Sequence, residues 1–189
     1  MSQTVTSLIR HTSQDLIAAT LPQNNTPIVV DLEAPGFNSL RRSSWLSGID
    51  LHRSIAGTVK GKGGSDEFSI FASRILSWLA EVGASNMRAE IAVVCADVRG
   101  VCDICVTGGY AEHGIVEIKC CDDLPQFSDW RHRLQLNLYA YAASQWNGRS
   151  STWGAIAYCS LRASAIRVFL FTQIRVQADA VDLAIRRAA

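Results

Sequence analysis

The chain has 189 residues, of which 48% are hydrophobic and 19% are charged, and its formal net charge is +1. This length fits one globular domain, and the hydrophobic fraction is large enough to fill its core. No apolar run reaches the roughly 18 residues that a membrane span needs, and the first residues lack the features of a secretory signal. We therefore expect a cytoplasmic protein with no membrane partner. The charge balance neither supports nor excludes binding to nucleic acid.

Residues 1–44 carry the weakest pattern, and we interpret them as an N-terminal accessory segment ahead of a main domain at residues 45–189. Within this segment, residues 8–19 have the pattern of a short helix and residues 28–32 that of a short strand. The Pro-Gly pair at residues 35–36 then breaks the pattern.

Two helices are expected next. The first covers residues 43–55 and carries Gly48 and His52 on one face, four residues apart. Residues 58–64 follow as a flexible basic loop. The second helix has apolar residues at helical spacing over residues 68–82.

Local signals mark the two ends of this second helix. Ser65 or Asp66 is the expected cap at its start, since short polar side chains accept hydrogen bonds from the first free N–H groups. Gly83 is the expected stop at its end.

Three strand-like segments follow at residues 89–95, 101–107 and 114–120, with glycines between them at hairpin distances. Residues 128–146 then have the pattern of a long amphipathic helix.

Two further β-rich runs, at residues 153–159 and 166–171, precede an alanine-rich helix at residues 176–188. The core order is therefore helix, three strands, helix, strand. The predicted fold class is α/β, with an αβββαβ core in which helices flank a mixed central sheet.

The strongest chemical signal comes from Asp103, Glu117 and Lys119. Glu117 and Lys119 lie two apart on one strand, so their side chains leave the same face of the sheet. An antiparallel neighbour brings Asp103 beside them. Two nearby carboxylates repel each other, and a divalent cation relieves that repulsion; hard oxygen ligands suit Mg²⁺ or Mn²⁺. The ammonium of Lys119 would then lie close to an attacking water and to charge developing on a phosphate.

A Glu-x-Lys pair alone is a weak signal, because exposed strands often alternate opposite charges. Here the surrounding segment, Gly114–Cys121, is otherwise almost wholly apolar. Charges in such a segment must pair or bind an ion, since burying an unpaired charge is costly.

This stretch resembles the PD-(D/E)XK nuclease superfamily, whose signature is an Asp followed, one hairpin later, by Glu/Asp-X-Lys. It is most similar to the RecB-like branch, which has a Gly-x-x-x-His helix upstream, matched here by Gly48 and His52. The downstream helix of that branch is matched, with one extra position, by His132, Gln135 and Tyr139.

The resemblance covers about residues 48–171 and implies a restriction-endonuclease-like fold with metal-dependent hydrolysis of DNA. It implies a catalytic set formed by Asp103, Glu117, Lys119, Gln135 and Tyr139. In this set Lys119 orients the water, and Gln135 and Tyr139 flank the site.

The metal ligands that it implies for Mg²⁺ or Mn²⁺ are His52, Asp103, Glu117 and the backbone carbonyl of Ile118. Glu90, at the start of a strand, is a further candidate because relatives often carry an acid there. His52 and the Gln135–Tyr139 pair also have a plainer interpretation, as packed or edge-of-core residues of their helices.

Contacts to nucleic acid are expected from basic side chains near these motifs, namely Lys60, Lys62, Arg131, His132 and Arg133. A solvated helix face explains Arg131 and Arg133 equally well. The segment at residues 57–63 is similar to a phosphate-binding loop. However, the spacer between its glycines is one residue short, and no Ser or Thr follows the lysine.

The six cysteines do not indicate a cofactor. A disulfide framework is not expected in a cytosolic chain. Iron–sulfur members of the RecB-like branch have a C-terminal cysteine trio, whereas only Cys159 follows Cys121 here, so we expect no iron–sulfur cluster. Cys102 and Cys105 are three apart on a strand and are expected to point to opposite faces, which argues against a shared zinc site.

Two alternatives stay open at this point. A protein of the same fold can act as a non-catalytic nucleic-acid-binding or structural module, although such members usually lose the acid or the lysine, and this chain keeps both. An RNA-directed or toxin-type nuclease would carry the same residues. A helicase or recombination partner is common for small nucleases, but no partner can be identified from the residues.

Overall fold

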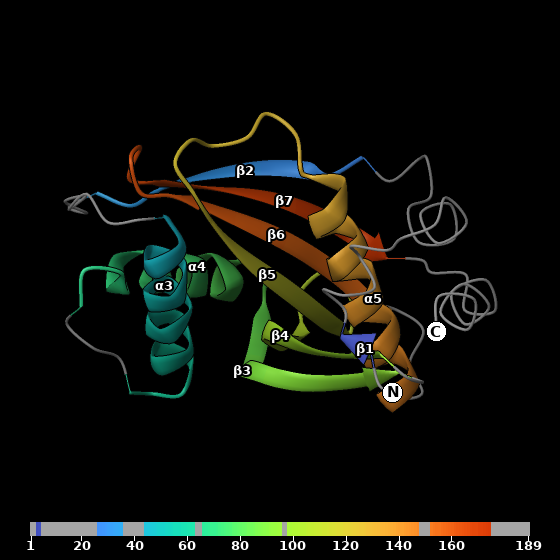
Figure 1. Cartoon of the computed structure of the whole chain (residues 1–189). Helices are drawn as coiled ribbons and strands as arrows, with labels where there is room; N and C mark the ends of the chain where they lie inside the picture. The colour runs from blue at the N-terminus through green and yellow to red at the C-terminus, as the bar shows by residue number, and fades with distance from the viewer. Residues whose placement is uncertain are drawn as a thin grey trace.

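The computed structural model describes residues 3–4, 26–35, 44–62, 66–95, 98–147 and 152–174. The elements in Figure 1 are β1 (Gln3–Thr4), β2 (Ile28–Glu33), α3 (Ser44–Val59), α4 (Ser69–Glu81), β3 (Ala84–Cys95), β4 (Val98–Gly108), β5 (His113–Cys121), α5 (Trp130–Asn147), β6 (Thr152–Ser160) and β7 (Ala165–Ile174). The helices expected at residues 8–19 and 176–188 lie outside the described residues. The other expected helices and strands are present, with shifted ends.

The strands form one mixed sheet of seven strands in the order β1-β4-β5-β6-β7-β2, and β3 pairs with β4 beside this path. The β4–β5 and β6–β7 pairs are antiparallel, whereas β5 and β6 are parallel. A parallel pair needs a crossover connection, and α5 supplies it. The predicted α/β class, the mixed sheet and the αβββαβ order are therefore confirmed.

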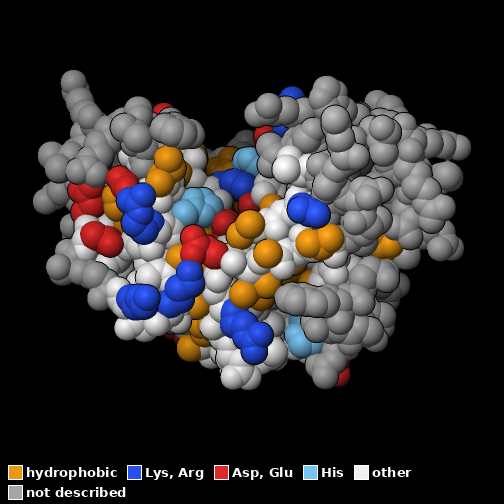
Figure 2. Space-filling view, turned by 60° about the horizontal axis from the view of Figure 1, so that its bottom comes forward, with side chains coloured by type: hydrophobic (Ala, Val, Ile, Leu, Met, Phe, Trp, Pro, Cys, Tyr) orange, Lys and Arg blue, Asp and Glu red, His pale blue; other side chains and the backbone are white. Residues whose placement is uncertain are grey.

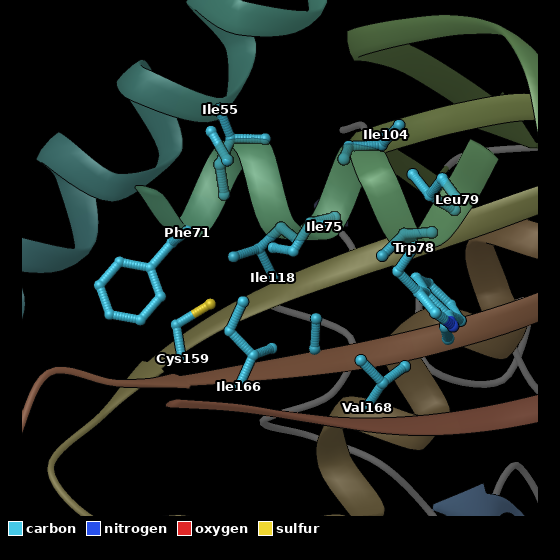
Figure 3. Packing of buried hydrophobic residues seen from close by; sticks show 14 of the residues in the cluster. Ile55, Phe71, Ile75, Trp78, Leu79, Ile104, Ile118, Cys159, Ile166 and Val168 are labelled. Carbon is cyan, nitrogen blue, oxygen red and sulfur yellow. The ribbon is translucent and has the colours of Figure 1, made fainter. Parts of the chain in front are cut away.

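Helices cover both faces of the sheet (Figure 1). α3 and α4 pack on one face in a core that includes Ile55, Phe71, Ile75, Trp78, Leu79, Ile104, Ile118, Cys159, Ile166 and Val168 (Figure 3). α5 packs on the other face, where its buried residues meet Tyr158 and Phe169. β6 lies between the two layers, and all nine of its residues are buried. No helix among the described residues is long and apolar enough to cross a membrane.

The sequence analysis placed the end of the first helix too early. α3 continues to Val59, through the segment expected to start a loop, because Ile55 and Ala56 are buried against the core. Thr58 also bonds back into the helix, donating its hydroxyl to the carbonyl of Ser54 at 2.9 Å. Burial of this last turn outweighs the low helix propensity of Gly57.

The start of α4 also differs from expectation. The residue before the helix is Phe68, without a side-chain cap. Asp66 instead accepts the Phe68 N–H at 3.0 Å and the Ser54 hydroxyl at 2.8 Å, so it ties the turn before α4 to α3. Ser65 lies outside the described residues. The predicted stop is confirmed, since Gly83 follows the helix with a φ of +81°.

The strand predicted in the accessory segment is confirmed and belongs to the central sheet. β2 pairs antiparallel with β7 along its whole length. Arg167 donates to both carboxylate oxygens of Asp31 at 2.7 Å, which adds a bidentate contact across the pair.

Candidate active site

Asp103 lies where two strands of the sheet separate. β4 pairs with β5 from Thr107–His113 to Ile104–Val116. The last of these pairs, at Ile104, is next to Asp103, which has no pairing partner on β5. There the Asp103 Oδ2 atom accepts the backbone N–H of Ile118 from 2.7 Å. A side-chain oxygen thus replaces the missing strand partner of a buried N–H group. This contact fixes the Asp103 carboxylate beside β5, next to Glu117.

The strand on the other side of β4, β3, has an irregular backbone opposite Asp103. Ala89 pairs with Ile104 and Ile91 pairs with Cys102, so Glu90 faces Asp103. Glu90 has a φ of +56°, a left-handed conformation that costs energy in a residue other than glycine. Strain of this kind persists only where the surrounding structure enforces it.

The alternation of side chains also breaks here, which overturns one argument made from the sequence. Cys102 and Cys105 both pack on the α5 side of the sheet, whereas Ile104 packs on the α3 and α4 side. The thiols of Cys102 and Cys105 interact, and this contact raises the pKa of Cys102 and lowers the pKa of Cys105. The expectation that these two cysteines point to opposite faces is wrong, because the strand is not regular between them.

Glu117 and Lys119 are linked to α5 by a chain of hydrogen bonds. The Lys119 Nζ atom donates to Glu117 Oε1 at 2.6 Å and to Gln135 Oε1 at 3.1 Å. Gln135 in turn donates from Nε2 to the Tyr139 hydroxyl at 3.1 Å. Two strand residues and two helix residues that are far apart in sequence therefore form one polar group, and Lys119 lies at its centre.

Glu117 is the most deeply buried charged group of the site, with 2% of its surface exposed. Burial, followed by the charge of Asp103, raises the pKa of Glu117 to about 7. Its second oxygen, Oε2, is buried and has no hydrogen-bond partner. A buried acceptor without a partner is costly, so this position lacks a positive or donating group.

His52 reaches the site from α3. Its Nδ1 atom lies 3.0 Å from Asp103 Oδ1. Burial alone would lower the pKa of His52, but the hydrogen bond and the charge of Asp103 outweigh burial and raise it. Both oxygens of Asp103 are therefore engaged, one by α3 and one by β5.

A cleft of about 690 Å³ opens beside these residues, and its walls are Gly48, Ile49, His52, Arg53, Glu90, Ile118, Lys119 and Cys120. Figure 2 shows a hollow on this side of the molecule around which acidic, basic and histidine side chains gather. Glu90 pairs with Lys60 at one wall of the cleft. Lys62 is exposed just beyond the end of α3.

The basic residues of α5 differ in their surroundings. Arg131 is exposed, with its guanidinium 5.3 Å from the centre of the Trp130 ring. Arg133 instead lies 5.5 Å from the centre of the Phe171 ring, and burial lowers its pKa. Because its Nε atom is buried without a partner, Arg133 is directed toward the sheet and is less open to a ligand than Arg131.

His132 is held by a residue that the sequence did not single out. Its Nδ1 atom lies 2.8 Å from the Tyr158 hydroxyl, which also accepts the backbone N–H of Asp129 at 3.0 Å. Burial, followed by the charge of Lys119, lowers the pKa of His132 to about 4, so the ring is neutral at pH 7.

Sequence reasoning missed the wall residues Ile49, Arg53 and Cys120, and it also missed Tyr158, which holds His132. Ile49 and Arg53 lie one position after Gly48 and His52, at the same helical spacing, so extending the Gly48–His52 face would have found them. Tyr158 had no such signal. It reaches the site because β6 pairs with β5 in a register that sets Tyr158 beside Lys119.

The residues fit a divalent cation in part. Carboxylates, an imidazole and an unpartnered buried Glu117 oxygen are the donor types that Mg²⁺ or Mn²⁺ accepts. However, among the described residues no group of three or more His, Cys, Asp or Glu side chains is already arranged to hold a metal ion. The present contacts of His52 and Lys119 with the two carboxylates would have to rearrange for metal binding.

Comparisons with known proteins do not add a function. No protein-family model matches the chain, and no curated protein matches it. Among solved structures, the crystal structure of SSO0001 is similar, with 15% sequence identity and a TM-score of 0.41, over 64% of this chain and 58% of that one. The chain thus spans a little over half the length of that neighbour. We draw no functional conclusion from so distant a likeness.

Proposed function

We propose that this protein is a Mg²⁺- or Mn²⁺-dependent nuclease that hydrolyses phosphodiester bonds of DNA at Asp103, Glu117 and Lys119. The observation that carries the proposal is Glu117, a buried carboxylate with a raised pKa and one oxygen without a partner, beside a second carboxylate. Structural carboxylates are usually satisfied by hydrogen bonds or ion pairs, whereas carboxyls with strongly shifted pKa values are typical of functional sites.

Asp103, Glu117 and His52, with the carbonyl of Ile118, are the residues that would hold the cation. When bound, the cation would neutralise charge on the phosphate and make water a stronger nucleophile. Two carboxylates that repel each other in the present arrangement supply the negative charge for it.

Lys119 would position the attacking water and stabilise charge that develops on the phosphate. Its ammonium is held from two sides, by Glu117 and by Gln135. Tyr139 accepts a hydrogen bond from Gln135, so it acts on Lys119 through that amide. Holding the group in advance reduces the reorganisation that the reaction needs.

The cleft favours a phosphate backbone as the ligand. It is open to solvent, and Arg53 on its wall has 73% of its side chain exposed. Lys60 and Lys62 follow at the end of α3. Local basic groups suffice for phosphate contacts in a chain with a net charge near zero. A cytoplasmic location, RNA as an alternative substrate and a helicase or recombination partner belong to the same proposal.

One observation favours a rival function, a non-catalytic module of the same fold. The charges of the site already pair with one another, His52 with Asp103 and Lys119 with Glu117. A purely structural role would need nothing more than these pairs, although it would leave the unpartnered Glu117 oxygen without an explanation.

A digestion experiment separates the two functions. Linear duplex, closed circular and single-stranded DNA, and an RNA of the same length, are incubated with the protein in Mg²⁺, Mn²⁺ or a chelator. We expect cleavage of DNA that needs the metal and disappears in Glu117→Gln. Metal-independent cleavage, or none in the wild type with either metal, contradicts the proposal. Closed circles that stay intact would identify an exonuclease.

A further inference from the structure

We infer that the loop before α5 and the first turn of that helix, at Phe127, Trp130 and Arg131, form a subsite that binds unpaired nucleotides next to the catalytic centre. This inference rests on the proposed function and names its substrate class, single-stranded DNA or an unpaired DNA end.

Two large aromatic side chains are exposed within four residues of each other. Phe127 has 80% of its surface exposed, and Trp130 has 41%. Among the described residues, Phe127 is the most exposed of the large hydrophobic side chains. Single exposed apolar residues are ordinary, but here the Arg131 guanidinium lies 5.3 Å from the centre of the Trp130 ring, and Phe127 is exposed three residues before Trp130.

The loop that displays these rings is anchored at several points. The carbonyl of Asp122 accepts the Ser160 hydroxyl at 2.6 Å, and the carbonyl of Pro125 accepts Arg167 at 3.3 Å. At the other end, the Asp129 N–H donates to the Tyr158 hydroxyl. Phe127 therefore projects from a segment tied to the sheet on both sides, so its exposure is built into the fold.

Of the three subsite residues, Arg131 lies on the same helix face as Gln135 and Tyr139 of the centre. Arg131, Gln135 and Tyr139 follow one another at intervals of four residues, and Gln135 contacts Lys119. Four residues of helix rise about 6 Å. This distance is on the order of two nucleotide steps of a stacked strand, at about 3.4 Å each. A strand with its phosphate at Lys119 can thus reach Arg131.

The chemistry of the surface selects unpaired bases over duplex. Stacking needs a free base face, which an unpaired nucleotide offers and a base pair inside a duplex does not. The positive charge of this surface is small, so it gives little preference for duplex DNA, which is more highly charged than a single strand. Arg131 is the exposed cation of this turn. The Asp129 carboxylate accepts the backbone N–H of Arg131 at 2.7 Å, which reduces the positive potential of the helix start.

The test compares Phe127→Ser and Trp130→Ser with the wild type and with Val94→Ser as a matched control. Val94 is an exposed apolar residue, with 59% of its surface accessible, on β3. Binding to a single-stranded oligonucleotide and to a blunt duplex is measured in Ca²⁺, and cleavage of both is measured in Mn²⁺. Urea unfolding checks that each variant is folded.

We expect Phe127→Ser and Trp130→Ser each to weaken single-strand binding by about 5- to 150-fold, the range for loss of one stacked base. The KM for single strands should rise with kcat unchanged, because the rings do not touch the reacting atoms. Duplex binding should change less than about twofold, and Val94→Ser should match the wild type.

The failures are distinguishable. Metal-dependent cleavage by the wild type, with unchanged single-strand binding in both aromatic variants, overturns the subsite but leaves the nuclease intact. Equal losses for duplex and single strand overturn the preference for unpaired bases. A wild type that neither binds nor cleaves either DNA overturns the subsite and the proposed function together.

Discussion

The carboxylate of Asp103 accepts the backbone N–H of Ile118 from 2.7 Å, at the point where β4 leaves β5. One side chain therefore completes the hydrogen bonding of the sheet and also supplies a charge to the candidate site. Removing the charge and removing the acceptor should have different consequences, which two substitutions can separate.

Asp103→Ala should lower the free energy of unfolding by about 1–3 kcal/mol, the usual cost of leaving a buried N–H without a partner. Asp103→Asn should cost less, because its side-chain carbonyl still accepts from Ile118. Both should lose cleavage. Urea unfolding in a chelator measures the difference, and equal losses of stability would show that the Ile118 contact is unimportant.

Mn²⁺ should raise the melting temperature of the wild type but not of Glu117→Gln. A ligand that binds only the folded state stabilises it by about 2.7 kcal/mol at a hundred times its Kd. Thermal unfolding with and without metal makes the measurement, with Glu81→Gln, an exposed acid at the end of α4, as the control. If the shift persists in Glu117→Gln and in Asp103→Asn, the metal binds elsewhere.

His132 should make the protein less stable in mild acid. Burial lowers its pKa to about 4 from an ordinary value of 6.5, so between these values the unfolded chain binds the extra proton. Stability contributed by the neutral ring is therefore present above pH 6.5 and is lost as the pH falls toward 4. His132→Gln should flatten the fall in unfolding free energy over this window. A histidine resonance that titrates near 6.5 for His132 would contradict the assignment.

Gly114→Ala should destabilise the fold without touching the site. A Cβ at position 114 would lie 2.2 Å from a ring carbon of Trp153. That ring is fully buried and is held by a 2.8 Å hydrogen bond to the carbonyl of Gly108, so it cannot move aside. We expect a loss of about 1–3 kcal/mol or more on urea unfolding. Trp153→Phe combined with Gly114→Ala should lose less than the two single changes added together.

Much of the fold follows from local patterns. The order of α3 to β7 was predictable, because apolar residues at helical or alternating spacing mark each element and glycines separate the strands. Element ends were less predictable, as at α3, whose last turn is held by burial of Ile55 and Ala56. Such burial depends on residues far away in the sequence.

The residues that meet at the candidate site could be selected from the sequence, but their geometry could not. The spacing of Glu117 and Lys119 indicates a shared face, whereas the ion pair between them and the contact of Lys119 with Gln135 depend on the α5 crossover. The left-handed Glu90 and the shared side of Cys102 and Cys105 were not predictable, because regular alternation was assumed where β3 and β4 are irregular.

The most direct test of the nuclease assignment is Lys119→Met, with single-turnover cleavage in Mn²⁺ and DNA binding in Ca²⁺ measured on one preparation. The variant keeps an unbranched stem in the half-buried position but loses the ammonium between Glu117 and Gln135. We expect the cleavage rate to fall by about 10²–10⁴, the usual scale for a positioned group, while the Kd for DNA changes far less. A variant that cleaves at the wild-type rate would contradict the assignment, and a parallel loss of binding would make Lys119 a backbone contact.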